Sequence, residues 1–314
     1  MGKIAFVFPG QGSQAVGMGK ELAANFEQAK VLFEKADETL KFPLSQLIFE
    51  GPKEELTLTK NTQPALLTTS MALLSHFEQF GIKADYVAGH SLGEYSALVA
   101  SGVLSFEDAV YAVRKRGEFM QEAVPQGEGA MAAVLGLDRQ ALTAVAEEVT
   151  KEGFDVQLAN LNCPGQIVIS GTAKGVELAS AKAKEAGAKR ALPLEVSGPF
   201  HSKLMKPAAE RFSSVLDELT MKDAEIPVIA NVTANPTSSK EKIKELLIEQ
   251  LYSSVLWEDS VQKLMELGVD TFIEIGPGKV LAGLIKKIDR KAKIYSIYDE
   301  ETSSAVANAL KEEN

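Results

Sequence analysis

Residues 89–94 read Gly-His-Ser-Leu-Gly-Glu and directly follow the apolar run Tyr86-Val87-Ala88. An apolar run before the motif and a helical pattern after it predict a strand that turns into a helix at Ser91. A serine between two glycines at such a turn is typical of a nucleophile elbow, in which a strained turn holds the hydroxyl above a sheet. Glycine and serine are also ordinary turn residues, so the rest of the sequence has to distinguish the two interpretations.

Strand-like and helix-like segments alternate on both sides of this turn, which predicts an α/β protein with a mostly parallel sheet. Within residues 128–196 the order becomes β-α-β-β-α-β, the order of a ferredoxin-like unit. We therefore expect a small subdomain of residues 128–196 inserted into a larger α/β domain of residues 1–127 and 197–314. The junction of two such units is a frequent place for a ligand cleft. In the larger domain, helices are expected over residues 21–40, 64–80 and 92–100 and in a long stretch that ends at residue 267.

The composition argues against several classes of function. The chain has 314 residues, 45% of them hydrophobic, and a net charge of −10. This acidic balance argues against nucleic acid and anionic membranes as partners, because both need a clustered cationic surface. No run approaches about 18 apolar residues and no secretion signal is recognisable, so we expect a cytoplasmic protein without a membrane span. The single cysteine, Cys163, and three scattered histidines argue against an intrachain disulfide and a metal site.

A serine nucleophile needs a neighbouring base, and the chain offers three histidines. His90 lies next to Ser91 across a sharp turn, where side chains usually point apart, and His76 falls in an apolar helix. His201 lies in a segment whose residues predict a loop directly before the next helix, and it is the best candidate for the base. We find no acid between Ser91 and His201 at an obvious strand end, so a Ser-Asp-His order is not demonstrated. A dyad oriented by something other than a carboxylate remains open.

A second glycine-rich loop, Phe8-Pro-Gly-Gln-Gly-Ser-Gln14, follows the first predicted strand. Residues 10–15 match the dinucleotide fingerprint Gly-x-Gly-x-x-Ala, but the fingerprint also requires a second strand that ends in an acid. Here Asp37 falls inside a predicted helix, which argues against a dinucleotide. The alternative is an oxyanion hole, to which Gln11 and Leu92 each contribute a backbone N–H.

Arg116 lies on an apolar helical stripe. The stripe consists of Phe106, Ala109, Val113, Arg116 and Met120. An arginine there either extends to the edge of the apolar surface or binds a buried anion, and its planar fork suits a carboxylate.

Seven motifs together resemble those of the malonyl-CoA:acyl carrier protein transacylases of bacterial fatty-acid synthesis. They are residues 8–14, Asn61-Thr-Gln-Pro-Ala65, residues 89–94, Arg116-x-x-x-Met120, Gly198-Pro-Phe-His-Ser202, Gln250-Leu-Tyr252 and Ile275-Gly-Pro-Gly278. They occur in the family's order over nearly the whole chain. The resemblance implies an α/β-hydrolase-like core with an inserted ferredoxin-like subdomain.

The resemblance also implies a role for each matching position. Ser91 matches the acylated nucleophile and His201 its base, which the family orients through carbonyl groups near Gln250 instead of an aspartate. Gln11 and Leu92 match the oxyanion-hole positions, and Arg116 matches the arginine that binds the malonyl carboxylate. At two further positions, Gln63 matches a supporting pocket residue and Phe200 the type found in malonyl-selective members.

The expected substrate is malonyl-CoA and the expected partner is acyl carrier protein, which carries the phosphopantetheine, so no resident cofactor is expected. Because acyl carrier proteins are acidic, docking would need a basic patch. The candidates are Lys286, Lys287, Arg290, Lys291 and Lys293, or Lys182, Lys184, Lys189 and Arg190. Two alternatives share the same motifs: a serine thioesterase or esterase, and a non-enzymatic carrier-binding scaffold.

Overall fold

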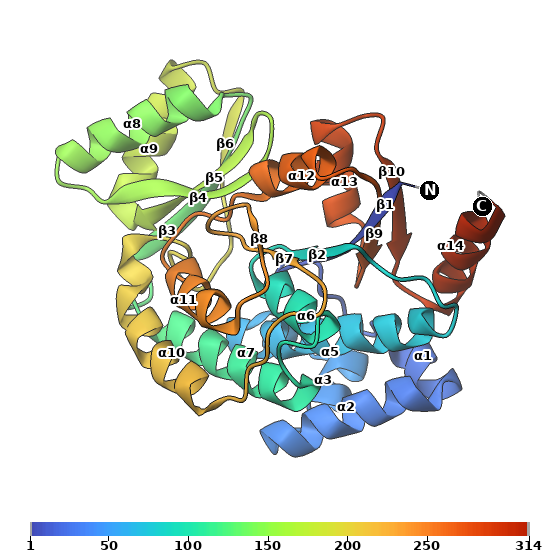
Figure 1. Cartoon of the computed structure of the whole chain (residues 1–314). Helices are drawn as coiled ribbons and strands as arrows, with labels where there is room; N and C mark the ends of the chain where they lie inside the picture. The colour runs from blue at the N-terminus through green and yellow to red at the C-terminus, as the bar shows by residue number, and fades with distance from the viewer. Residues whose placement is uncertain (1, 313–314) are drawn as a thin grey trace.

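The computed structural model describes residues 2–312, which form two sheets and the helices that cover them (Figure 1). The strands are β1 (Lys3–Phe8), β2 (Tyr86–Gly89), β3 (Gly129–Leu135), β4 (Val156–Cys163), β5 (Gln166–Thr172), β6 (Arg190–Pro193), β7 (Val228–Ile229), β8 (Pro236–Thr237), β9 (Val269–Ile275) and β10 (Lys293–Ile297). The helices are α1 (Lys20–Asn25), α2 (Glu27–Leu40), α3 (Leu44–Glu50), α4 (Lys53–Thr57), α5 (Thr59–Glu78), α6 (Leu92–Ala100), α7 (Phe106–Glu122), α8 (Arg139–Lys151), α9 (Ala173–Glu185), η1 (Lys203–Met205, 3-10), α10 (Lys206–Glu218), α11 (Lys240–Gln250), α12 (Trp257–Glu266), α13 (Val280–Ile288) and α14 (Glu300–Glu312).

The larger sheet has the order β10-β9-β1-β2-β7-β8 and is parallel except for β8. It is buried on both faces, because side chains alternate along each strand. Ile4, Phe6 and Phe8 of β1 pack in the cluster that includes α5, α6 and α7. Ala5 and Val7 pack in the cluster on the opposite face, with α12 and α13. The apolar run of β1 therefore reflects a central strand with helices on both sides.

The smaller sheet has the order β4-β5-β3-β6 and is antiparallel throughout. Its elements follow one another along the chain as β3-α8-β4-β5-α9-β6, and α8 and α9 share a separate hydrophobic cluster with it. The predicted fold class, a parallel α/β core together with a ferredoxin-like unit, is confirmed. The exact boundaries at residues 128 and 196 stay a prediction, and a second sheet that lies within residues 129–193 is consistent with them.

Three predicted helices differ from those in the structure. The helix expected over 21–40 is two helices, because Phe26 is extended, with φ −128° and ψ 109°. The helix expected from residue 64 begins five residues earlier, so Pro64 lies inside α5. The long stretch that ends near residue 267 is interrupted between Gln250 and Trp257. This last break leaves the final carbonyl groups of α11 without helical partners, so they are free to accept other hydrogen bonds.

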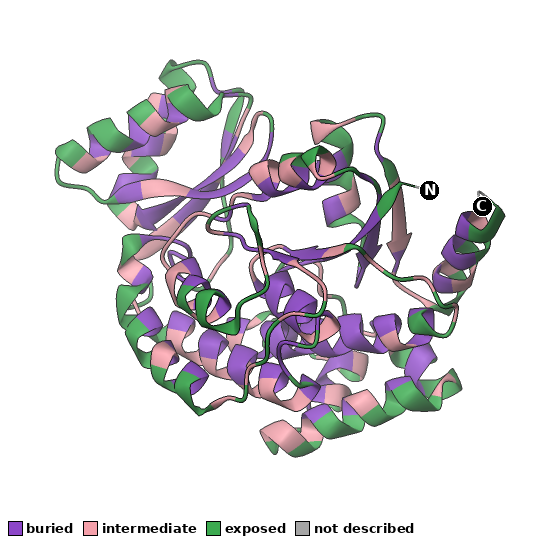
Figure 2. Cartoon of the chain, viewed as in Figure 1, coloured by how far each residue is buried: buried purple, intermediate pink, exposed green. Residues whose placement is uncertain are grey.

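Burial follows these layers (Figure 2). Figure 2 shows buried positions along β1 and β2 and on the inner faces of α5, α6 and α7, whereas α2 and α8 present exposed outer faces. Among residues 2–312, no helix has both the length and the apolar character needed to cross a bilayer.

The turn at Ser91 depends on close backbone contacts. Phe8 of β1 lies in register with Gly89 of β2, so the loops that follow these parallel strands meet at one edge of the sheet. A Cβ atom on Gly89 would lie 1.9 Å from the carbonyl carbon of Gly93, and one on Gly93 would lie 2.0 Å from the Phe8 carbonyl oxygen. Only glycine permits this approach, and the approach brings the two glycine-rich loops together.

We expect Gly89→Ala to lower the free energy of unfolding by at least about 3 kcal/mol, because the added methyl group meets rigid backbone. Chemical denaturation of the purified protein measures the change. The matched control is Gly283→Ala in α13, where a Cβ meets nothing within 4 Å. This control substitution should raise the free energy of unfolding by about 0.5–1 kcal/mol, since alanine is a better helix former than glycine. Equal stability of the two variants would contradict the steric argument.

Candidate active site

A cavity of about 130 Å³ lies where the loops after β1 and β2 face the smaller sheet. Every site residue predicted from the sequence lines it except Gln250, which is fully buried. Met131 of β3, Asn160 of β4, and Leu194 and Val196 just after β6 line it as well. The structure therefore brings together residues that are spread over nearly the whole chain.

Ser91 occupies a strained turn at the start of α6, with φ 51° and ψ −104°. Its backbone N–H donates to Asn231 Oδ1 at 2.7 Å, and Asn231 Nδ2 donates to the carbonyl oxygen of Gly89 at 2.7 Å. The Asn231 amide thus bridges the two sides of the turn and offsets part of its strain. We did not predict Asn231, since it is 140 residues from Ser91 in sequence and belongs to no motif that marks it.

His201 is hydrogen-bonded on both ring nitrogens. Nε2 lies 2.7 Å from Ser91 Oγ, and Nδ1 lies 2.8 Å from the carbonyl oxygen of Gln250. A carbonyl only accepts hydrogen bonds, so Nδ1 carries the proton and Nε2 accepts from the Ser91 hydroxyl. The carbonyl that holds the ring lies at the end of α11, where the helix is interrupted. Within residues 2–312, the arrangement is therefore an oriented Ser-His pair without a carboxylate, which the sequence left open.

The surroundings of His201 keep its ring neutral. Burial lowers the pKa of His201 to about 3, and the nearby charge of Arg116 acts in the same direction. The hydrogen bond to Gln250 opposes both effects but is the smaller influence. Above about pH 5 the imidazole is therefore able to accept a proton.

Arg116 lines the cavity with 1% of its surface exposed, so the interpretation that it extends to the edge of the apolar surface is wrong. Its Nη1 donates to Gln63 Oε1 at 2.7 Å, and its Nη2 donates to Gln250 Oε1 at 2.8 Å and to Ser91 Oγ at 3.1 Å. Its Nε has no hydrogen-bond partner within residues 2–312. A buried cation bonded only to neutral oxygens, next to a serine hydroxyl, is suited to bind an anionic group attached to an acyl chain.

The loop after β1 packs directly on the elbow. A Cβ on Gly10 would lie 2.4 Å from the carbonyl oxygen of His90, which places Gln11 beside the turn. Leu92 is the first residue of α6, and N–H groups in the first turn of a helix lack helical partners. Both residues expected to supply the N–H groups of an oxyanion hole thus line the cavity, and their role stays a prediction. Phe200, 6% exposed, forms part of the wall next to His201.

Comparisons with known proteins agree with this arrangement. The family model for the acyl transferase domain matches residues 5–308. The chain belongs to this family. A malonyl CoA-acyl carrier protein transacylase from Bacillus subtilis is 67% identical over 314 residues, which is 100% of this chain and 99% of the relative. The resemblance drawn from the motifs is therefore confirmed, and the chain is an acyltransferase.

Solved structures are similar over nearly their whole length. An acyl carrier protein S-malonyltransferase from Vibrio cholerae superimposes with a TM-score of 0.95 at 46% identity, covering 97% of this chain and 99% of that one. A malonyl-transacylase in complex with a type II PKS acyl-carrier protein superimposes with a TM-score of 0.95 at 44% identity, covering 98% and 99%. These relatives carry transacylase names, which does not favour the thioesterase or esterase alternative.

The two other histidines have hydrogen-bond partners of their own, although His90 lines the same cavity. His90 Nε2 is 2.8 Å from Asn162 Oδ1, and His76 Nδ1 is 2.9 Å from Ser303 Oγ. After the first glycine-rich loop come α1 and α2 instead of a second strand, and Asp37 lies within α2, so the dinucleotide alternative is wrong. In the part of the chain that the structure describes, no three His, Cys, Asp or Glu side chains are grouped to hold a metal.

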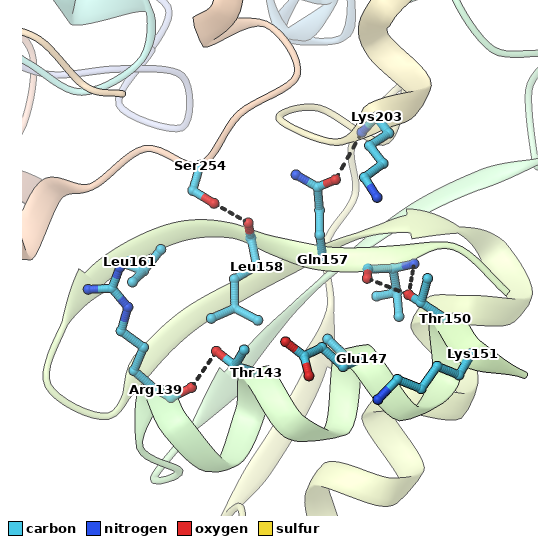
Figure 3. A pocket seen from close by; sticks show the side chains of 12 residues that line it. Arg139, Thr143, Glu147, Thr150, Lys151, Gln157, Leu158, Leu161, Lys203 and Ser254 are labelled. Carbon is cyan, nitrogen blue, oxygen red and sulfur yellow. Dashed lines mark hydrogen bonds between the residues drawn. The ribbon is translucent and has the colours of Figure 1, made fainter. Parts of the chain in front are cut away.

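A larger cavity of about 450 Å³ lies between α8 and β4, with Lys203 and Ser254 at its rim (Figure 3). It is larger than the site at Ser91, but its lining contains no nucleophile paired with a base. Its connection to the site is Gln157, whose Nε2 donates to the carbonyl oxygen of His201 at 3.2 Å. The smaller cavity is therefore the candidate active site.

We expect His201 of the free acyltransferase to stay neutral from about pH 8 to about pH 5, with its proton on Nδ1. Nitrogen chemical shifts of ¹⁵N-histidine-labelled protein report both properties, and His201→Gln assigns the signal. The denatured protein serves as the control, because its histidines should titrate near the unperturbed value of about 6.5. Since the folded pKa is lowered, protons bind preferentially to the unfolded chain, and this residue destabilises the fold as the pH falls below about 6.5. A midpoint for His201 near 6.5 in the folded protein would contradict the assignment.

Proposed function

We propose that this acyltransferase moves a malonyl group from malonyl-CoA to the phosphopantetheine thiol of acyl carrier protein through a malonyl ester of Ser91. The observation that carries the proposal is the buried guanidinium of Arg116, whose Nη2 lies 3.1 Å from Ser91 Oγ. A malonyl group differs from an acetyl group by one carboxylate, and Arg116 supplies its counter-charge. The names of the relatives and the complex of one of them with a type II PKS acyl-carrier protein support the same donor and the same class of acceptor. The motif resemblance favours a place in fatty-acid synthesis.

In the first half-reaction, Ser91 Oγ attacks the thioester carbonyl of malonyl-CoA. His201 Nε2 takes the hydroxyl proton, and the hydrogen bond from Nδ1 to the Gln250 carbonyl keeps the ring aligned. The N–H groups of Gln11 and Leu92 stabilise the oxyanion. When the intermediate collapses, the thiolate of coenzyme A leaves and receives the proton from His201.

In the second half-reaction, the carrier thiol attacks the malonyl ester, and His201 transfers the thiol proton to the departing Ser91 oxygen. The two halves share one covalent intermediate, so the kinetics are ping-pong. Coenzyme A enters as part of a substrate and phosphopantetheine as part of the partner, so the scheme uses no resident cofactor. Gln63 holds the Arg116 fork through Nη1, and Phe200 limits the room beside the acyl group.

Mass spectrometry of the intact protein after mixing with malonyl-CoA, followed by addition of holo acyl carrier protein, tests the proposal. We expect a malonyl adduct on Ser91 that then moves to the carrier, and no adduct on Ser91→Ala. An adduct lost only to water would support a thioesterase or esterase. Transfer by Ser91→Ala at the parent rate would overturn the nucleophile assignment, and no adduct on the parent would support a scaffold.

We expect Arg116→Ala to reduce kcat/KM for malonyl-CoA by about 10²–10³-fold, because truncation removes the counter-charge of a buried carboxylate. The effect on acetyl-CoA should be much smaller, since an acetyl group has no charge to lose. Steady-state transfer to the carrier with both substrates gives the ratio.

Lys115→Ala is the control for Arg116→Ala. Lys115 directly precedes Arg116 in α7, but its side chain does not line the cavity. The Lys115 side chain is 34% exposed and pairs with Glu118. This variant should retain both activities. If Arg116→Ala lost malonyl and acetyl transfer equally, the carboxylate role would be abandoned.

A further inference from the structure

Behind the elbow, a second buried charge faces Arg116. Glu94 lies in the first turn of α6 with 3% of its surface exposed. Its Oε2 accepts from Gln250 Nε2 at 2.7 Å and from the backbone N–H of Asn231 at 3.1 Å. The proposed mechanism gives this carboxylate no part, although it lies next to the residues that shape the site.

Gln250 connects Glu94 to Arg116 through one amide group. Its Oε1 accepts from Arg116 Nη2 at 2.8 Å, and its Nε2 donates to Glu94. The same Nε2 also lies 3.2 Å from the carbonyl oxygen of Ser91. The cation and the carboxylate are thus held on opposite sides of a single polarisable amide, close enough to interact through a low-dielectric interior.

When Glu94 is ionised, the charges of this buried group balance in the free protein. Arg116 on α7 is the charged group that acts on Glu94. Tyr95, the next residue of α6, is a phenol whose pKa is raised by burial, so it is neutral. His201 is neutral as well, and α11 and the segment after β7 contribute the uncharged amides of Gln250 and Asn231. One cation therefore faces one carboxylate.

We propose that Glu94 takes up a proton when the malonyl carboxylate binds to Arg116, so that binding of this acyl group is linked to protonation behind the nucleophile. This inference rests on the proposed function, because the added anion is the malonyl carboxylate. Two carboxylates that share one buried cation leave a net negative charge, which is costly away from water. Protonation of one of them restores neutrality.

Glu94 is the carboxylate that takes the proton. Burial raises the pKa of Glu94 to about 7, and the hydrogen bonds from Gln250 and Asn231 and the charge of Arg116 only partly oppose this. The malonyl carboxylate, in contrast, contacts the guanidinium directly, which favours its ionised form. When the malonyl carboxylate binds the guanidinium of Arg116, its negative charge offsets the attraction that Arg116 exerts on ionised Glu94. The pKa of Glu94 then rises further.

Transfer of the malonyl group from coenzyme A to Ser91 neither releases nor takes up a proton. Serine and a thioester become an ester and a thiol, so the Ser91 proton ends on the sulfur of coenzyme A and no net proton is exchanged with solvent. Proton uptake that accompanies malonyl binding therefore belongs to the protein. Linkage then requires malonyl affinity to fall as the pH rises through the range in which free Glu94 is ionised.

Calorimetry of Ser91→Ala with malonyl-CoA measures the proton directly, because this variant binds without transfer. Titrations in two buffers of different ionisation enthalpy give the number of protons taken up. Acetyl-CoA is the control ligand, because it carries the same phosphates but no acyl carboxylate. If the bound carboxylate raises the pKa of Glu94 by about 1–2, binding of malonyl-CoA should be accompanied by uptake of more protons than binding of acetyl-CoA. We expect a difference of about 0.4–0.8 proton between about pH 7 and 8. The affinity for malonyl-CoA should fall by about 5- to 25-fold between about pH 7 and 9.

Glu94→Gln, added to Ser91→Ala, replaces the carboxylate with a neutral amide of the same shape that still accepts from Gln250. We expect this variant to lose the extra proton uptake and to bind malonyl-CoA with little pH dependence. Glu274→Gln in the same background is the matched control. Glu274 is also buried with its pKa raised to about 7, but it accepts from the N–H groups of Leu281 and Ala282 on another helix. This variant should retain the uptake.

The outcomes separate this inference from the proposed function. Equal proton uptake with malonyl-CoA and acetyl-CoA in Ser91→Ala, while the parent forms the malonyl adduct, would overturn the linkage and leave the transfer standing. Uptake that persists in Glu94→Gln would assign the proton to another group and would also overturn it. Absence of the adduct in the parent would instead overturn the function on which the inference rests.

Discussion

The buried charge of Arg116 is the constraint on which the rest of the site depends. A guanidinium keeps its proton at any physiological pH, so with 1% exposure it has to be solvated by the protein. The oxygens that do this come from Gln63 on α5, Gln250 on α11 and Ser91 at the elbow. All three are neutral, and the carboxylate of Glu94 is held one amide away. Among the described residues the cation is therefore balanced only through the Gln250 amide, which leaves the guanidinium available to a second anion, whose added charge the proposed protonation of Glu94 offsets.

The same arrangement ties the smaller sheet to the chemistry. His201 has a positive φ of 57°, which is unfavourable for a side chain with a Cβ, and several contacts hold it there. Its N–H donates to the carbonyl oxygen of Leu251 at 3.2 Å, beside the Nδ1 contact to Gln250. Its own carbonyl accepts from Gln157, which projects from β4 of the smaller sheet. The end of α11 and the smaller sheet thus fix the position of one imidazole together, and the ferredoxin-like unit does more than cover the cavity.

Local patterns were enough to predict the strand before the elbow, the elbow itself and the ferredoxin-like order, because strand period and turn chemistry are encoded within a few residues. They did not predict the strands β8 and β10. The breaks at Phe26 and after Gln250 were missed, since neither a glycine nor a proline stands at them and tertiary packing determines where those helices end. For the same reason the carbonyl that orients His201 has no signature of its own, and its place came only from a family resemblance. Asn231 and Glu94 were given no role, although Glu94 is part of the motif at Ser91. Their places in the site depend on burial against residues far away in sequence, which no local pattern encodes.

The absence of a carboxylate beside His201 follows from the chemistry that the site is proposed to perform. A carboxylate at Nδ1 would raise the basicity of the ring, whereas the Gln250 carbonyl aligns it without adding charge next to Arg116. The two acceptors for an acyl-serine differ in how much they need a base. A thiol, with a pKa near 8.5, is already ionised to a few per cent at neutral pH, but water has a pKa of about 15.7 and depends on proton removal as it attacks. The carrier thiol therefore depends less than water does on His201 as a base, which favours transfer to a carrier over hydrolysis.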